Sequence, residues 1–115
     1  MEINNQTIGK IQILFLTGNL INDDFDEVKK FVDRYIEDNN IEGVIFNCKQ
    51  LGYIDSHGLG YIASVLKEFT KINKKFSLSS VSNENMELFI LTKLDKILCI
   101  TENDQDSLEK MKLSP

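Results

Sequence analysis

The sequence predicts an α/β fold: a mixed, mostly parallel β-sheet whose first hairpin is antiparallel, flanked by about four helices in the order ββαβαβαβα. Two observations support this prediction. Short apolar, β-rich runs alternate with segments whose apolar residues recur at helical spacing. The 115 residues contain no repeat or linker, and the single proline is the last residue. Strands that alternate with helices pair in parallel through right-handed crossovers. Since the chain has the length of one domain and no linker, we expect one domain over residues 1–115.

The N-terminal segment predicts the hairpin. Glu2–Ile8 is polar, as expected for an edge strand, and Gly9-Lys10 supplies a turn. The run from Ile11 to Leu16 is apolar at odd and even positions, which indicates a strand covered on both faces. We expect Gly18 to end this second strand.

The next segment predicts an amphipathic helix that ends at Asp38-Asn39-Asn40. Its apolar stripe consists of Phe25, Val28, Phe31, Val32, Tyr35 and Ile36. We expect Asn22, Asp23 or Asp24 to cap the helix, because a short side-chain oxygen accepts from a free first-turn amide. The acidic residues here, including Asp26, are interpreted as helix-start residues and not as magnesium ligands.

Strands and helices alternate over the rest of the chain. The expected strands are Val44–Phe46 with Cys48, Phe76–Val81 and Ile97–Ile100. Three further helices are expected. The first begins at Ser56, the second is capped by Asn83, and the third spans Asp104–Lys112. The stripe of the helix that begins at Ser56 consists of Leu59, Ile62, Ala63, Leu66, Phe69 and Ile72. These elements complete the predicted order.

Charge and composition limit the classes of function. Eighteen acidic residues against thirteen basic ones give a net charge of −5. Binding to nucleic acid or to an anionic membrane needs a positive surface, so we expect neither as a partner. No apolar run approaches the roughly 20 residues of a membrane span, and the N-terminus lacks the pattern of a signal peptide. We therefore expect a cytoplasmic protein.

The cysteines and the histidine predict neither a disulfide scaffold nor a metal site. Cys48 and Cys99 lie in apolar runs and are expected to be buried free thiols. The only histidine, His57, has no zinc-ligand spacing to either cysteine. We expect no cofactor.

The segment Leu51–Gly60, LGYIDSHGLG, carries the most information about function. Gly58 and Gly60 lie in the first turns of a predicted helix, where each costs about 1 kcal/mol relative to alanine. Such glycines indicate tight packing or a close approach to the backbone. Ser56 lies at the positive end of the same helix, where first-turn amides favour an anion.

Two catalytic interpretations of this segment fail. A phosphate-binding loop needs a lysine and a Ser or Thr after its glycines, but Gly60 is followed by Tyr61-Ile62. A Ser-His-Asp triad needs a base placed by a separate element, but Asp55, Ser56 and His57 are adjacent. We therefore predict that the protein is not an enzyme and that Ser56 is modified by another protein's active site.

The segment resembles the signature Asp-Ser-x-Gly-Leu-Gly of the STAS domain, a fold shared by anti-sigma factor antagonists and the tails of sulfate transporters. The resemblance extends to Leu16-Thr17-Gly18, to the lead-in Phe46–Leu51, and to Leu94-Asp95-Lys96-Ile97 before the last strand. It covers nearly the whole chain in the expected order of elements.

The resemblance implies a phosphorylation switch. In this family the serine after the aspartate is phosphorylated by a serine kinase that is also an anti-sigma factor. The unphosphorylated antagonist binds this kinase and frees the sigma factor, the phosphorylated form releases it, and a PP2C-type phosphatase resets the system. By resemblance Ser56 is the acceptor, and its environment consists of Asp55, His57, Gly58, Leu59 and Gly60.

A partner surface is expected beside the acceptor. Its predicted residues are Ile21, Asn22, Asp23, Phe25, Tyr61 and Val65. Tyr61 and Val65 stack one turn apart on a helix, and the alternative is that they only widen the core stripe. Asn19 and Ile21 stand where family members often have acidic residues, which puts the contribution of this turn to kinase contact in question.

Two other functions remain open. A scaffold or output module of a partner-switching system with a target other than a sigma factor would have the same residues. Some members of this fold are proposed to bind nucleotides, but this chain offers no lysine-containing phosphate loop. A monomer or weak dimer is expected, because the exposed edge strand permits self-association without requiring it.

Overall fold

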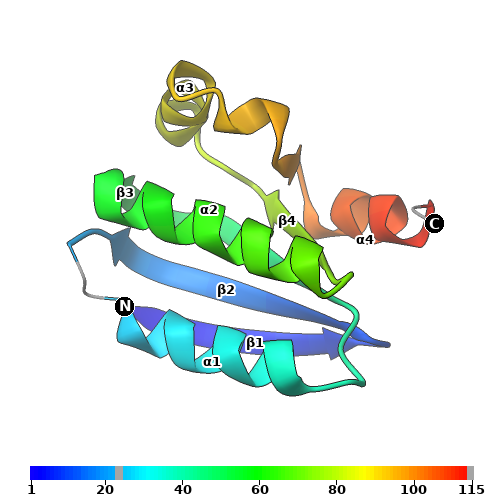
Figure 1. The fold of residues 1–115 in the computed structure, drawn as a ribbon. Helices are drawn as coiled ribbons and strands as arrows, with labels where there is room; N and C mark the ends of the chain where they lie inside the picture. Colours follow the sequence, from blue (N-terminus) through cyan, green and yellow to red (C-terminus); the bar gives the residue numbers. More distant parts are fainter. Residues whose placement is uncertain (23–24, 114–115) are drawn as a thin grey trace.

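The computed structural model describes residues 1–22 and 25–113, which form a five-stranded sheet in the order β1-β2-β3-β4-β5 (Figure 1). The strands are β1 (Glu2–Ile8), β2 (Ile11–Leu20), β3 (Gly43–Ile54), β4 (Lys75–Ser79) and β5 (Cys99–Thr101). β1 pairs antiparallel with β2, and the other three pairs are parallel. The predicted α/β class and order of elements are therefore confirmed.

The helices divide between the two faces of the sheet. They are α1 (Asp26–Glu37), α2 (Ser56–Lys71), α3 (Asn83–Leu91) and α4 (Asp104–Leu113). Figure 1 shows α1 and α2 side by side in front of the sheet. The main core gathers sheet residues of one parity, such as Leu14 and Phe46, with α1, α2 and α3. A smaller cluster on the opposite face joins Ile13 and Ile45 to Leu108 and Met111 of α4.

Two strands run further than the sequence predicts. Gly18 does not end β2, because pairing with β3 continues through Gly18–Leu51 and Leu20–Ile54. Gly18 instead takes a positive φ of 121° between two register shifts, so the glycine permits an irregularity inside the strand. β3 likewise continues to Ile54, beyond the expected strand of Val44–Phe46 with Cys48.

Two predicted helix caps are wrong. Ser82, not Asn83, is the N-cap of α3, and its hydroxyl accepts from the Asn85 N–H at 3.2 Å. Phe25 occupies the N-cap position of α1 and makes no side-chain capping bond. Asp23 and Asp24, two of the three expected caps, lie outside the described residues.

The last strand, β5, is shorter than expected because a 3-10 turn at Leu94–Lys96 precedes it.

The two cysteines occupy different environments. Cys48 is buried, and burial together with the negative charge of Asp104 raises the pKa of its thiol to about 12. Cys99 is only half-buried, because β5 lies at the edge of the sheet. The expectation that both thiols are buried is therefore corrected for Cys99.

Candidate phosphoacceptor site

Ser56 is the first residue of α2, directly after the carboxyl end of β3. Its neighbour Asp55 is the N-cap, and the Asp55 carboxylate accepts from the Gly58 N–H at 3.0 Å. Ser56 itself is exposed. A hydroxyl at the start of a long helix is therefore exposed to solvent at a hydrogen-bonded strand-to-helix junction.

Asp55 also ties the β2–α1 connection to this junction. Its second carboxylate oxygen accepts from the Asn22 N–H at 2.7 Å, and the Asp55 N–H donates to the Leu20 carbonyl at 3.2 Å. The two backbone N–H groups, first Asn22 and then Gly58, lower the pKa of the Asp55 carboxyl. One ionised side chain thus holds two chain segments beside Ser56.

Two asparagines, Asn19 and Asn22, shape the same end of the sheet in ways that their sequence positions did not predict. Asn22 has a φ of 54°, a left-handed conformation that asparagine tolerates better than most residues. The Asn19 side-chain oxygen accepts from the Tyr53 N–H at 2.9 Å. Asparagine at a turn before a helix is the sequence signal that points to such conformations.

The two glycines of the signature have different structural environments. A Cβ on Gly58 would lie 2.2 Å from the Leu20 carbonyl oxygen, so tight packing of α2 against β2 requires this glycine. A Cβ on Gly60 would meet nothing within 4 Å. Because residues four apart share a helix face, Gly60 leaves the surface one turn beyond Ser56 without a side chain.

Part of the predicted partner surface is buried. Phe25 and Val65 are 3% and 2% exposed and belong to the main core, which corrects their expected place on a partner surface. Tyr61 is half-buried because its ring packs on Phe25, with centroids 5.0 Å apart, and Lys29 lies over both rings. Burial raises the pKa of Tyr61. The rings of Phe25 and Tyr61 therefore pack against each other between the start of α1 and α2.

The remaining predicted residues lie near Ser56 in sequence or space. Asn22 is exposed and Ile21 is half-buried, while Asp23 lies outside the described residues. His57 is exposed, and its Nδ1 lies 3.6 Å from an Asp55 carboxylate oxygen. Leu59 is half-buried against the main core. The structure thus brings Asp55, His57 and Asn22 together around Ser56.

Within residues 1–22 and 25–113, no group of three or more His, Cys, Asp or Glu side chains is placed to hold a metal ion. No helix in the same part of the chain has the length and apolar character to cross a membrane.

The chain belongs to the STAS domain family, whose model matches residues 2–109. It is 25% identical over 103 residues to the anti-sigma F factor antagonist of Paenibacillus polymyxa, covering 90% of this chain and 88% of the relative. A crystal structure of a Thermotoga maritima protein has a TM-score of 0.88 at 22% identity, covering 96% and 94% of the two chains.

Solved structures of the anti-sigma factor antagonist SpoIIAA share the fold. The unphosphorylated form has a TM-score of 0.80 at 14% identity, with 99% of each chain covered. The phosphorylated form from Bacillus has a TM-score of 0.74 at 14% identity, covering 96% of this chain and 99% of that one. The family model, the sequence relative and the solved structures thus agree with the resemblance that the signature segment indicated.

Proposed function

We propose that this protein is an anti-sigma factor antagonist switched by phosphorylation of Ser56. The unphosphorylated form binds an anti-sigma factor serine kinase, and the phosphorylated form releases it. The observation that carries the proposal is the exposed Ser56 hydroxyl at the start of α2, beside the N-cap Asp55. Membership of the STAS family and the named antagonist relative support this role.

In this proposal the phosphate acts at the partner contact and does not refold the domain, and the position of Ser56 at a helix N-terminus supports this. A phosphate adds about −1.5 to −2 charges, and a helix N-terminus favours each by about 0.3–1 kcal/mol. The free protein therefore tolerates the modification. A partner packed over Ser56 and the bare backbone of Gly60 would instead meet a hydrated dianion next to ionised Asp55. A loss of about 3–4 kcal/mol of binding free energy weakens the affinity for the partner roughly 100- to 1,000-fold.

The other parts of the proposal follow from the same family role. We infer a single STAS domain over residues 1–115 that acts in the cytoplasm as a monomer or weak dimer, without cofactor or catalytic activity. A PP2C-type phosphatase returns phosphorylated Ser56 to the binding form. Neither nucleic acid nor membrane is a partner, in keeping with the net charge of −5.

Intact mass and peptide mapping of the protein isolated from its native cells in several growth conditions test the switch. We expect phosphate on Ser56 that varies with condition and is absent in Ser56→Ala. Ser64 is a matched control, because it is exposed on the same helix and donates only to the Tyr61 carbonyl, so Ser64→Ala should leave the phosphate unchanged. A chain never phosphorylated would contradict the proposal and favour a constitutive scaffold.

Amide NMR spectra of the two forms test the mechanism. Shifts confined to the start of α2 and the β2–α1 connection are expected, because Asp55 links these two segments. Widespread shifts across the sheet would show that phosphorylation acts by refolding instead.

A further inference from the structure

The strand β1 forms one edge of the sheet and has an open side (Figure 1). Among residues 1–22 and 25–113, β2 is the only strand that pairs with β1. In an antiparallel pair every second residue bonds to the neighbouring strand, and the residues between them direct their N–H and C=O groups away from it. Every residue of β1 except Ile3 is exposed. The outer side of β1 therefore offers backbone donors and acceptors to another strand.

The turn after β1 shows which residues face the open side. Only Gly9 and Lys10 separate Ile8 from Ile11, and Gly9 has a φ of 59°. Such a four-residue turn closes with a hydrogen bond between its first and last residues. Ile8 therefore bonds to β2, as does every second residue before it. The backbone groups on the open side belong to the residues between them: Ile3, Asn5 and Thr7.

β1 lacks the features that keep natural edge strands from pairing. These features are short length, proline, bulges and charged side chains. β1 has seven residues, pairs with β2 without a register shift, and carries a single charged side chain, on Glu2. The opposite edge of the sheet is β5, which has only three residues. Of the two edges, β1 is therefore the one suited to receive another strand.

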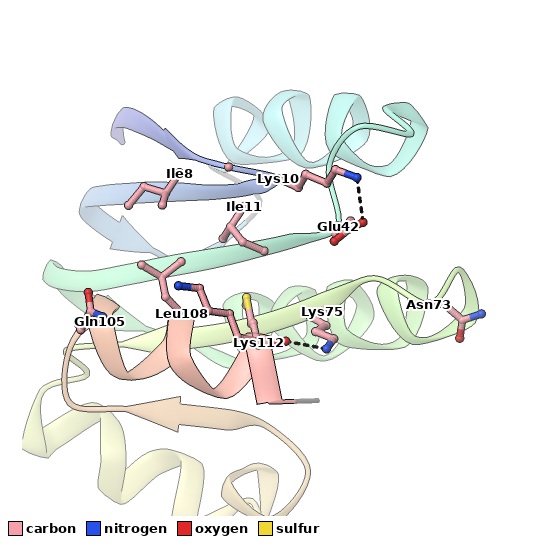
Figure 2. Close-up of a pocket in the computed structure, with 11 residues that line it drawn as sticks. Ile8, Lys10, Ile11, Glu42, Asn73, Lys75, Gln105, Leu108 and Lys112 are labelled. Atoms are coloured by element: carbon pink, nitrogen blue, oxygen red, sulfur yellow. Dashed lines mark hydrogen bonds and ion pairs between the residues drawn. The ribbon is translucent and has the colours of Figure 1, made fainter. Parts of the chain in front are cut away.

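The neighbouring helices leave this edge accessible. α1 packs on one face of the sheet, where Ile3 is half-buried against the main core. Figure 2 shows the other face, where Ile8 of β1 lies across a groove from Leu108 of α4. Because the rest of β1 is exposed, a further strand can pair with it without displacing either helix.

The amide side chains at the centre of β1 are complementary to those of a second copy. When two copies of β1 run antiparallel around Asn5, all seven residues of each strand are paired. Asn5 then lies opposite Asn5, and Asn4 lies opposite Gln6. Amide side chains both donate and accept, so each can bond to its counterpart across the strands.

The outer residues of β1 also suit this arrangement. Ile3 lies opposite Thr7, and both are β-branched residues of the kind that favours strands and cross-strand contact. Each Glu2 lies opposite Ile8, so no like charges face each other. An unrelated peptide would match only the backbone groups of this edge, whereas a second copy also matches its side chains. The observations therefore favour a copy of this chain as the occupant.

We propose that β1 pairs antiparallel with β1 of a second copy, centred on Asn5, and joins two five-stranded sheets into one. Ile3, Asn5 and Thr7 are the hydrogen-bonded positions of this contact. Seven residues on each side are fewer than the about 20–30 of stable complexes, so the dimer is weak. The proposal specifies the weak dimer inferred above and does not depend on phosphorylation of Ser56.

Sedimentation and amide hydrogen exchange of the full chain, over a range of protein concentrations, test the contact. We expect a monomer–dimer equilibrium. Amide exchange at Ile3, Asn5 and Thr7 should slow as the dimer forms, while Asn4 and Gln6, already bonded to β2, should change less. A chain that stays monomeric up to about 1 mM, or a dimer that leaves these three amides unprotected, would overturn the proposal.

Variants identify the pairing edge. Asn4→Lys/Gln6→Lys should weaken dimerisation at least about tenfold, because it sets lysines opposite each other twice across the contact. Asn83→Lys/Gln105→Lys is the matched control, since it adds the same charge at exposed positions on α3 and α4. An equal loss in the control would show a general charge effect and overturn the proposal.

Asn5→Pro is a second, independent variant. Proline removes the outward N–H, and an edge strand accepts proline where that N–H faces solvent. We expect a folded monomer, and an undiminished dimer would exclude this edge. Ser56→Ala should dimerise as the wild type does, so failure of the dimer and failure of the switch are seen separately.

Discussion

The two faces of the sheet are built in different ways. On the face that bears α1 and α2, the core is apolar, and Phe46, Phe69 and Phe76 form edge-to-face ring pairs with centroids 4.8 and 5.8 Å apart. On the face that bears α4, the apolar cluster is small and a buried polar network adjoins it. The first face therefore supplies most of the hydrophobic stabilisation.

The polar network fixes the position of α4. The hydroxyl of Ser107 lies 2.6 Å from those of both Ser77 and Thr101. At the start of the helix, the Asp104 carboxylate accepts from the Asn47 amide at 3.0 Å and from the Ser79 hydroxyl. Because hydrogen bonds are directional, they select one orientation of a helix that has little apolar surface of its own. One face therefore supplies most of the stability, and the other fixes the orientation of α4.

The largest expected effect is on the first face. Phe46→Ala should lower the free energy of unfolding by about 3–5 kcal/mol, because Phe46 is fully buried and its removal leaves a cavity. Denaturant titration measures this loss. Leu91→Ala is the control, since Leu91 is 80% exposed and should change stability little. A similar loss in both variants would contradict the description of this core.

Leu108→Ala tests the second face. We expect a loss of about 2 kcal/mol, near the lower limit for a buried leucine, because the adjoining groove gives water and neighbouring side chains access to the space. Denaturant titration again provides the measurement. A loss as large as that of Phe46→Ala would show that the two faces contribute equally.

Ser107→Ala tests the polar network. Removing this hydroxyl takes one partner from both Ser77 and Thr101, which keep bonds to backbone carbonyls. We therefore expect a loss of about 1 kcal/mol in denaturant titration. Ser64→Ala, at an exposed serine, should have a smaller effect. No difference between these two variants would remove the network from the account of how α4 is held.

The smallest effect concerns the pH dependence of the Ser56 end of the sheet. The folded-state pKa of Asp55 is lowered, so its ionisation stabilises the fold above the unfolded pKa of about 3.9, and this contribution is lost as pH falls through the folded value. Asp55→Asn should therefore be less stable than wild type near neutral pH and approach it in acid. Asp26→Asn, at an exposed first-turn carboxylate, is the control. Thermal unfolding between pH 7 and about 3 measures both.

Local patterns were sufficient for the order of elements. Helical spacing located α2 and α4, and the polar composition of Glu2–Ile8 identified the edge strand, because periodicity and polarity depend on which face is buried. The pair of signature glycines also pointed to a special junction. Packing against Leu20 requires Gly58, whereas Gly60 is open to solvent.

Contacts between distant segments decided the rest. β2 continues past Gly18 because β3 pairs with it, and Phe25 and Val65 are buried because α1 closes on α2. The bond from Asn22 to Asp55 joins residues 33 positions apart. The sequence by itself determined which segments form strands and helices and where the proposed acceptor, Ser56, lies. Only the tertiary structure decided strand length and burial beside Ser56, because these depend on pairings that local spacing does not encode.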